Sequence, residues 1–327
     1  MSESTKTDIS TTLVDSVKKI LADINQERER EIISRRFGLY DRKETLEQIG
    51  DMLGITRERV RQLEKAILSR VRQNVSEGNM PVVNAMEKTL TAKLSEMGRA
   101  ARIQDLASEL LGQAPSPTEK AHIAFLAELA PNITVIGEND DYFQSAAISS
   151  LGDASSIKKK IEEIVKFIKK HGEPITADAM HEQMKYEHPS NIAALASLSK
   201  KLAQLKGNWG LIKWPTVNPK NIRDKIFVIL EDNGKPMHFS AIAKSIKQSD
   251  FKRKDVTTQA IHNELIKDKR FVLIGRGIYA LSAWGYSRGT VTDIITEVLK
   301  KSDTPLHRDE IVKQVLKSRQ VKEEEKS

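Results

Sequence analysis

The sequence predicts a mainly α-helical protein, in which a helix-turn-helix domain is followed by tandem winged-helix domains with small β-hairpins. Two observations predict this class. The first is a pair of amphipathic segments joined by a tight turn within residues 44–71. The second is a helical pattern that occurs four times further along the chain, and three of these copies continue into a β-like segment. The expected domains are the helix-turn-helix at 1–75, winged helices at 76–150, 151–220 and 221–286, and a partial fourth copy with a charged tail at 287–327.

Residues 44–71 carry the start and stop signals of two short helices. Thr45 precedes the first helix, and Gln48 three residues later completes a capping-box pattern. Gly54 is a natural helix-ending residue, and Thr56 can cap the next helix. The apolar residues repeat at helical spacing on one face of each segment: Leu46, Ile49 and Leu53, then Val60, Leu63, Ile67 and Val71.

The repeated pattern is anchored near the end of the first helix in each copy, at Gly98, Gly172, Gly234 and Asp303. Apolar residues stand four and eight residues before each anchor and eight and twelve residues after it, which is the spacing of one helical face. A third helix is expected around 118–129, 192–205 and 257–268, followed by "ITVIGENDDYF", "WGLIKW" and "FVLIGRGIYAL" as β-like stretches. Helix, turn, helix, helix and hairpin is the order of a winged helix.

Composition and charge limit the function classes. The chain has 327 residues and no cysteine, which excludes disulfides and thiolate chemistry. The net charge is +8, distributed as +2 over residues 1–75, −5 over 76–150, +5 over both 151–220 and 221–286, and +1 over 287–327. No apolar run approaches the roughly 18 residues that a spanning helix needs, and the first residues lack a signal-peptide core. We therefore expect a cytoplasmic protein with a polyanionic partner and no membrane partner.

The second helix of the helix-turn-helix carries the candidate DNA contacts. Its outward face predicts four base-reading residues, Arg57, Glu58, Arg61 and Gln62, because Arg pairs with guanine, Gln with adenine and Glu with cytosine. An ordinary solvated face with i, i+4 charge pairs is the alternative. The side chains expected to contact phosphates are Thr56, Arg59, Lys65, Arg70, Arg72, Lys252, Arg253 and Lys254. Arg59 lies off the outward face and could instead have an intramolecular partner.

Residues 35–72, "RRFGLYDRKETLEQIGDMLGITRERVRQLEKAILSRVR", resemble region 4 of the primary sigma factors of bacterial RNA polymerase. The resemblance extends over roughly residues 10–75. It implies a domain that reads the minus-thirty-five promoter element and contacts the polymerase flap, and hence a bacterial, nucleoid-associated protein. Residues 222–286, through "GKPMHFSAIAKSI" and "FVLIGRGIYALSAW", resemble a HARE-type winged helix, which is similar to the folded domain of the RNA polymerase delta subunit. Nothing in the chain resembles the sigma region that grips the polymerase clamp.

Catalytic signals are poor. There is no phosphate-binding glycine loop and no zinc-protease motif. His238 and His307 occupy equivalent repeat positions, which favours a turn or helix-cap role. We expect no enzyme activity, cofactor, metal or small-molecule substrate. The expected function is a DNA-binding transcription regulator with double-stranded DNA and RNA polymerase core as partners. The alternatives are a polymerase- or chromosome-associated scaffold and a DNA-targeting subunit of a restriction-modification system.

Overall fold

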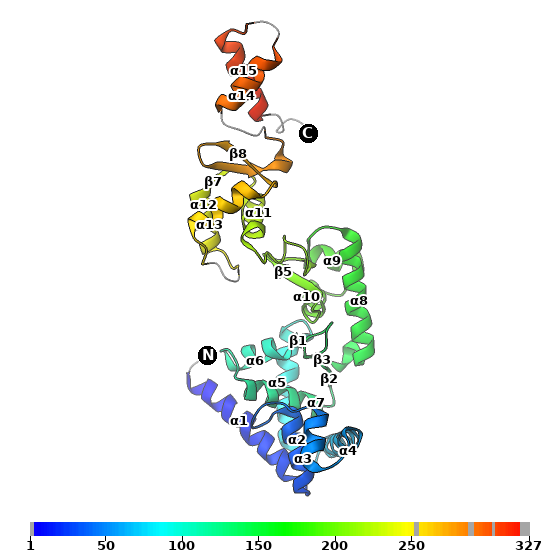
Figure 1. The fold of residues 1–327 in the computed structure, drawn as a ribbon. Coiled ribbons are helices and arrows are strands. Elements are labelled where there is room, and N and C mark those ends of the chain that lie inside the picture. Colours follow the sequence, from blue (N-terminus) through cyan, green and yellow to red (C-terminus); the bar gives the residue numbers. More distant parts are fainter. Residues whose placement is uncertain (1–2, 252–254, 287–290, 303–304, 321–327) are drawn as a thin grey trace. The chain divides into compact units, whose positions relative to one another are not determined.

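The structure, a computed structural model, describes residues 3–251, 255–286, 291–302 and 305–320. It confirms the predicted class, with many helices and small antiparallel sheets. The chain divides into two compact units, Met1–Leu211 and Ile212–Ser327, whose elements Figure 1 labels. Each unit is described by itself below.

Unit 1 begins with the predicted helix-turn-helix. Its helices are α1 (Glu3–Ala22), α2 (Glu27–Phe37), α3 (Leu46–Leu53) and α4 (Arg57–Ser76). The predicted capping box is present, because Thr45 Oγ1 accepts from Gln48 N at 3.2 Å and Gln48 Oε1 accepts from Thr45 N at 2.9 Å. Gly54 ends α3 in the left-handed conformation, and Thr56 caps α4. The local signals of the sequence therefore place the turn correctly.

The helix-turn-helix has two apolar surfaces with different partners. Ile32, Ile49 and Val60 form a small core between α2, α3 and α4. The C-terminal half of α4, which includes Val71, and a second face of α2, which includes Ile33, belong to a larger core shared with α1 and the following helices. The helix-turn-helix is thus packed onto the next segment of the chain through a continuous apolar core.

That next segment contains the first winged-helix-like repeat, which we call repeat 1. Its elements in order are α5 (Pro81–Glu96), β1 (Ala100–Arg102), α6 (Ile103–Leu111), α7 (Pro117–Leu129), β2 (Ile133–Ile136), β3 (Ser145–Ile148) and a 3₁₀ helix at Ser149–Leu151. The strands form an antiparallel sheet in the order β1-β3-β2. Helix α7 contacts α5 and α6 of its own repeat and also α1, α2 and α4 of the preceding domain (Figure 1). It is therefore the shared structural element of repeat 1 and the helix-turn-helix.

Repeat 2 has the same order of elements. They are α8 (Ala154–His171), β4 (Ile175–Thr176), α9 (Ala177–Met184), α10 (Pro189–Ser197), β5 (Leu202–Leu205) and β6 (Asn208–Leu211), with the sheet order β4-β6-β5. The predicted helix at 192–205 is wrong beyond Ser197. Backbone groups of residues 198–200 pair instead with residues 141–143 of repeat 1. Lys206 and Gly207, both with positive φ, then close a two-residue hairpin between β5 and β6.

The acidic hairpin region of repeat 1 contacts basic side chains of repeat 2. Glu138 accepts a hydrogen bond from Lys200 at 2.8 Å, and Lys201 lies 3.1 Å from Asp141. Tyr142 donates to Glu162 at 3.0 Å, and burial together with this bond raises the pKa of the phenol to about 12. Two of the acidic residues of this hairpin thus have cationic partners inside the chain.

Unit 2 repeats the pattern again. Its elements are α11 (Ile222–Asn233), β7 (Met237–His238), α12 (Phe239–Gln248), α13 (Thr258–Lys267), β8 (Phe271–Gly275), β9 (Ile278–Leu281), a 3₁₀ helix at Ser282–Trp284, α14 (Val291–Lys301) and α15 (Arg308–Gln320). The sheet order is β7-β9-β8, so all three sheets place their short first strand beside the last. The anchor Asp303 and the phosphate candidates Lys252, Arg253 and Lys254 lie outside the described residues.

The repeat anchors behave as the sequence predicts. Gly98, Gly172 and Gly234 have φ values of 84°, 85° and 62°, the left-handed conformation that ends each first helix. His238 caps α12, because its Nδ1 accepts from the backbone N–H of Ser240 at 3.3 Å. Asp309 N similarly lies 3.4 Å from Nδ1 of His307. The helix-cap prediction for these two histidines is confirmed.

Candidate nucleic-acid interface

The N-terminal half of α4 presents the predicted base-reading residues together on one exposed face. Arg57, Glu58, Arg61 and Gln62 are all exposed, while Val60 beside them is fully buried. The helical period and the small core of Ile32, Ile49 and Val60 therefore aim these four side chains away from the protein. This is the arrangement that a helix needs to enter the major groove with its first turns.

Two of the four candidates form an ion pair in the free protein. Arg61 donates from Nε to Glu58 Oε2 at 2.9 Å and from Nη2 to Glu58 Oε1 at 2.6 Å. The bonds from Arg61 lower the pKa of the Glu58 carboxyl, so this side chain is ionised at neutral pH. An exposed pair of this kind contributes little to stability, because water screens the attraction. A guanine edge can therefore compete for the Arg61 guanidinium at small cost.

The predicted phosphate contacts on α4 divide into two groups. Lys65 makes no hydrogen bond or ion pair with the described residues, and Arg59 makes one long bond of 3.4 Å to Gln62. Arg70 is paired with Glu29, and Arg72 donates to the backbone oxygen of Glu128 at 2.8 Å as well as to its carboxylate. The second group thus stabilises the packing of α4 on α2 and α7. Any phosphate contact of Arg70 or Arg72 would have to replace these partners.

The structure brings together a further group of cations that the sequence analysis does not single out. A cavity of about 390 Å³ lies between the loop before α3, the start of α6 and the first turns of α7. Its charged lining consists of four cations and two carboxylates: Arg42, Lys43, Arg102, Lys120, Asp41 and Glu138. Arg102 is paired with Asp105 at 2.6 Å. The other three cations make no ion pair with described residues. The position of Arg42 and Lys43 just before the cap of α3 is the sequence signal that could have indicated them.

Comparison with known families supports the interpretation of this region as a DNA-binding helix-turn-helix. The family model described as Sigma-70, region 4 matches residues 26–73. The match begins just before α2 and covers α3 and nearly all of α4. This stretch is a sigma-factor-like, DNA-binding helix-turn-helix region. The matched range is narrower than the predicted 10–75, since α1 lies outside it.

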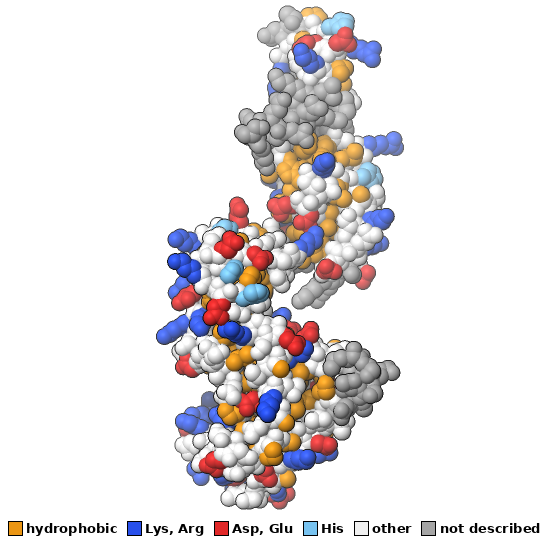
Figure 2. All heavy atoms as spheres, turned by 180° about the vertical axis from the view of Figure 1, so that it is seen from behind, with side chains coloured by type: hydrophobic (Ala, Val, Ile, Leu, Met, Phe, Trp, Pro, Cys, Tyr) orange, Lys and Arg blue, Asp and Glu red, His pale blue; other side chains and the backbone are white. Residues whose placement is uncertain are grey.

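Charged side chains do not form a single-sign field over the visible surface. Figure 2 shows Lys and Arg interspersed with Asp and Glu on the face it displays. The candidate DNA contacts are therefore individual side chains, such as Arg57 and Arg61, and not a broad basic surface. Among the residues that the structure describes, no helix is both long and apolar enough to span a membrane, and no three or more His, Asp or Glu side chains gather as potential metal ligands.

A buried histidine joins the helix-turn-helix to repeat 1. His122 of α7 is almost completely buried, and its Nε2 lies 2.8 Å from the backbone oxygen of Leu39, which follows α2. Since the Leu39 oxygen can only accept, Nε2 carries the proton and donates it. Burial lowers the pKa of His122 in spite of this bond and of nearby Glu119. The neutral imidazole is therefore the form that stabilises the junction.

We expect acid to weaken this junction. Because the pKa of His122 is lower in the folded chain than in the unfolded chain, the unfolded state gains the proton first. The free energy of unfolding should therefore fall as the pH drops below about 6.5. His122→Gln retains an N–H donor and does not titrate, so its thermal midpoint should fall less than that of the wild type between about pH 7.5 and about pH 5.5. Circular dichroism at constant ionic strength measures the thermal midpoints of the two proteins at each pH. Equal changes of the midpoint with pH in the wild type and the variant would contradict the prediction.

Proposed function

We propose that this protein is a transcription regulator that reads promoter-type duplex DNA through the exposed face of α4. The observation that carries the proposal is the gathering of Arg57, Glu58, Arg61 and Gln62 on the first turns of a helix in a region that matches the sigma-70 region 4 family. Each of these side chains can hydrogen-bond a base edge. The turn before them is formed by Gly54 in the left-handed conformation and by Thr56, whose side chain caps α4. No catalytic chemistry is proposed.

RNA polymerase core is the proposed protein partner, because the matched family belongs to sigma factors. The apolar surface of α2 and α4 is occupied by α7 and α1 within the chain. A polymerase contact would therefore use the exposed polar surface of unit 1, or unit 2. Co-purification of polymerase subunits with the full chain from native cells tests this part of the proposal. Recovery of the chain without polymerase would contradict it.

We use repeat 3 for residues 221–286. Repeats 2 and 3 are proposed to add sequence-independent affinity for duplex DNA. Residues 151–220 and 221–286 each carry a net charge of +5, whereas residues 76–150 carry −5. Since neutralised phosphates release counterions, basic repeats strengthen binding to all duplexes alike. Repeat 1 is proposed to act as a spacer, which is supported by the pairing of Glu138 and Asp141 with lysines of repeat 2.

The decisive variant for the proposed function is Arg61→Ala. Removing this guanidinium should weaken the best DNA site by about 1–3 kcal/mol and relax the preference at one base pair. Binding selection on randomised duplexes, followed by titration of the selected site, measures both effects. Lys88→Ala is the matched control, because Lys88 is an exposed cation of α5 that makes no ion pair with the described residues, so its removal should leave the base preference unchanged. Equally flat preferences for wild type and R61A would favour a scaffold that does not read sequence.

A further inference from the structure

The third helices of the three repeats differ in what covers them. In repeat 1, α7 is covered by five other helices of unit 1, and the run from His122 to Ala127 is buried. In repeat 2, α10 packs on β1 of repeat 1, and a Cβ added to Gly98 would stand 2.3 Å from the backbone oxygen of Ser190. Both helices thus use their outward surfaces for packing within unit 1.

Helix α13 of repeat 3 has a different surface. Only Ile261 and Leu265 of this helix are buried, and they pack against the rest of unit 2. Gln259, Asn263 and Ile266 lie on the opposite face at i, i+4 and i+7, and Ile266 is 59% exposed. The Gln259 amide donates to Asn263 Oδ1 at 3.1 Å, so the two amides stand side by side.

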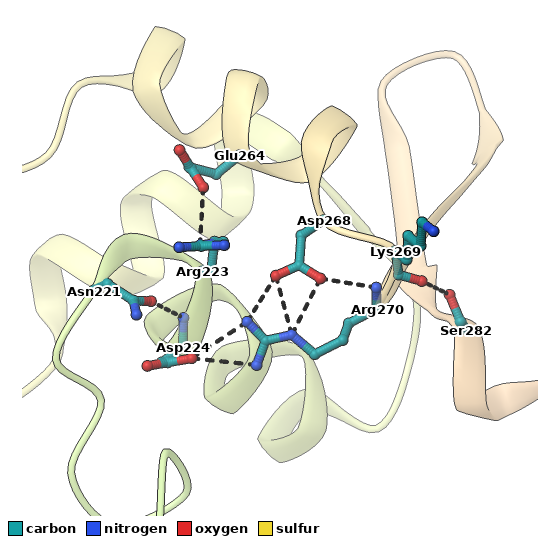
Figure 3. A network of polar contacts seen from close by, with 8 residues as sticks. All are labelled: Asn221, Arg223, Asp224, Glu264, Asp268, Lys269, Arg270 and Ser282. Atoms are coloured by element: carbon teal, nitrogen blue, oxygen red, sulfur yellow. Dashed lines mark hydrogen bonds and ion pairs between the residues drawn. The ribbon is translucent and has the colours of Figure 1, made fainter. Parts of the chain in front are cut away.

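The acidic groups at the end of α13 are neutralised on its inner side, as Figure 3 shows. Glu264 is paired with Arg223 of α11 at 3.2 Å. Asp268, which follows α13, is paired with Arg270 at 2.7 Å, and Arg270 also reaches Asp224 at 3.2 Å. The exposed amide face therefore carries no carboxylate, and the ion pairs connect the end of α13 to α11 and to Arg270, the residue before β8.

We propose that the outward face of α13 is a second base-reading surface and that it selects A·T base pairs in the major groove of duplex DNA. Gln and Asn side chains form paired hydrogen bonds with adenine, and an exposed aliphatic group contacts the methyl group of thymine. Gln259 and Asn263 supply the amides, and Ile266 supplies the apolar contact. No arginine stands on this face, so it lacks the side chain that reads guanine best.

The polarity of the face favours DNA over a protein partner. The corresponding helices that pack on protein bury apolar or small residues, such as Phe125 in α7 and Ala194 in α10. Two amides around one isoleucine would leave polar groups to be satisfied in a protein interface. Base edges in the major groove offer donors and acceptors to both amides. The +5 charge of residues 221–286 adds attraction to the duplex.

This inference rests on the proposed function, because it gives the same duplex a second contact. The full chain would then select a composite site, with one block that depends on α4 and one A·T block that depends on α13. Binding selection on long randomised duplexes with the wild type, the double variant Gln259→Ala/Asn263→Ala, and Arg61→Ala separates the two contacts. Gln183→Ala, an exposed glutamine on α9, is the matched control.

The double variant should lose the A·T block, weaken the best site about five- to 150-fold, and keep the α4 block. R61A should lose the α4 block and keep the A·T block. Q183A should select the same site as the wild type. Replacing thymines of the A·T block by deoxyuridine removes the methyl groups, and should weaken the wild type but not Ile266→Ala. An unchanged motif in the double variant, with R61A still altering its own block, overturns the α13 inference and leaves the proposed function standing. A wild type without any motif overturns both.

Discussion

Replacing Phe125 by alanine should lower the free energy of unfolding of unit 1 by about 3–5 kcal/mol, the usual range for a buried aromatic ring. Phe125 is 1% exposed, and its ring centroid lies 4.9 Å from that of Phe37 in α2. The substitution would leave a cavity between α7 and the helix-turn-helix, where the larger core is shared. We therefore expect one variant to destabilise both the DNA-reading region and repeat 1.

Urea unfolding followed by circular dichroism measures the total loss, and hydrogen exchange of α2 and α7 amides locates it. Phe167→Ala is the matched control, because Phe167 is only half-buried on α8 and stacks on His171 at 6.2 Å. The control should lose less stability and leave the exchange of α2 unchanged. If F125A accelerated exchange in α7 alone, the helix-turn-helix would be stable without repeat 1, contrary to this prediction.

The second large effect is expected from Gly98→Ala at the contact between repeats 1 and 2. The left-handed backbone of Gly98 makes any side chain strained, at about 1–3 kcal/mol. The added Cβ would also meet the backbone oxygen of Ser190 at 2.3 Å, so α10 must move. Overpacking of this kind adds about 1–3 kcal/mol. Both effects should lower the stability of unit 1.

Gly172→Ala provides a matched control for this prediction. Gly172 ends the equivalent helix of repeat 2 with a φ of 85°, close to the 84° of Gly98, and nothing lies within 4 Å of an added Cβ. Its substitution should therefore show the backbone strain alone. The difference between the two variants in unfolding free energy, measured by urea denaturation, reports the steric contact with α10. Equal losses would show that the contact between the repeats tolerates the extra methyl group.

Local features of the fold could be predicted from the sequence because their causes lie within a few residues. The Thr45 and Gln48 capping box, the Gly54 turn and the glycine helix ends depend on short-range hydrogen bonds and on backbone conformations that few residue types adopt. The exposure of Arg57 and Arg61 follows from helical periodicity and the buried position of Val60. These parts of the candidate site agree with the sequence analysis.

Features that depend on contacts between distant residues could not be predicted. Residues 202–205 continue an apolar helical pattern, and they form a strand because residues 198–200 pair with repeat 1 and Gly207 closes a hairpin. The sequence predicts Arg70 and Arg72 as phosphate contacts. In the structure they are paired with Glu29 and Glu128, which are 41 and 56 residues distant along the chain. Periodicity shows which face of a helix is apolar, and it does not show which element covers that face.

Helix α1 is synthesised long before the surface that covers it. Leu13 and Val17 are fully buried in the core that α1 shares with α5, α6 and α7, and Ser10 donates to Glu119 of α7 at 2.9 Å. While the ribosome is still extending the chain towards α7, the apolar face of α1 has no native partner. Such transiently exposed faces are sites of aggregation and of chaperone binding. A nascent chain that ends after the helix-turn-helix should therefore be captured by chaperones, and release should follow once α7 has emerged.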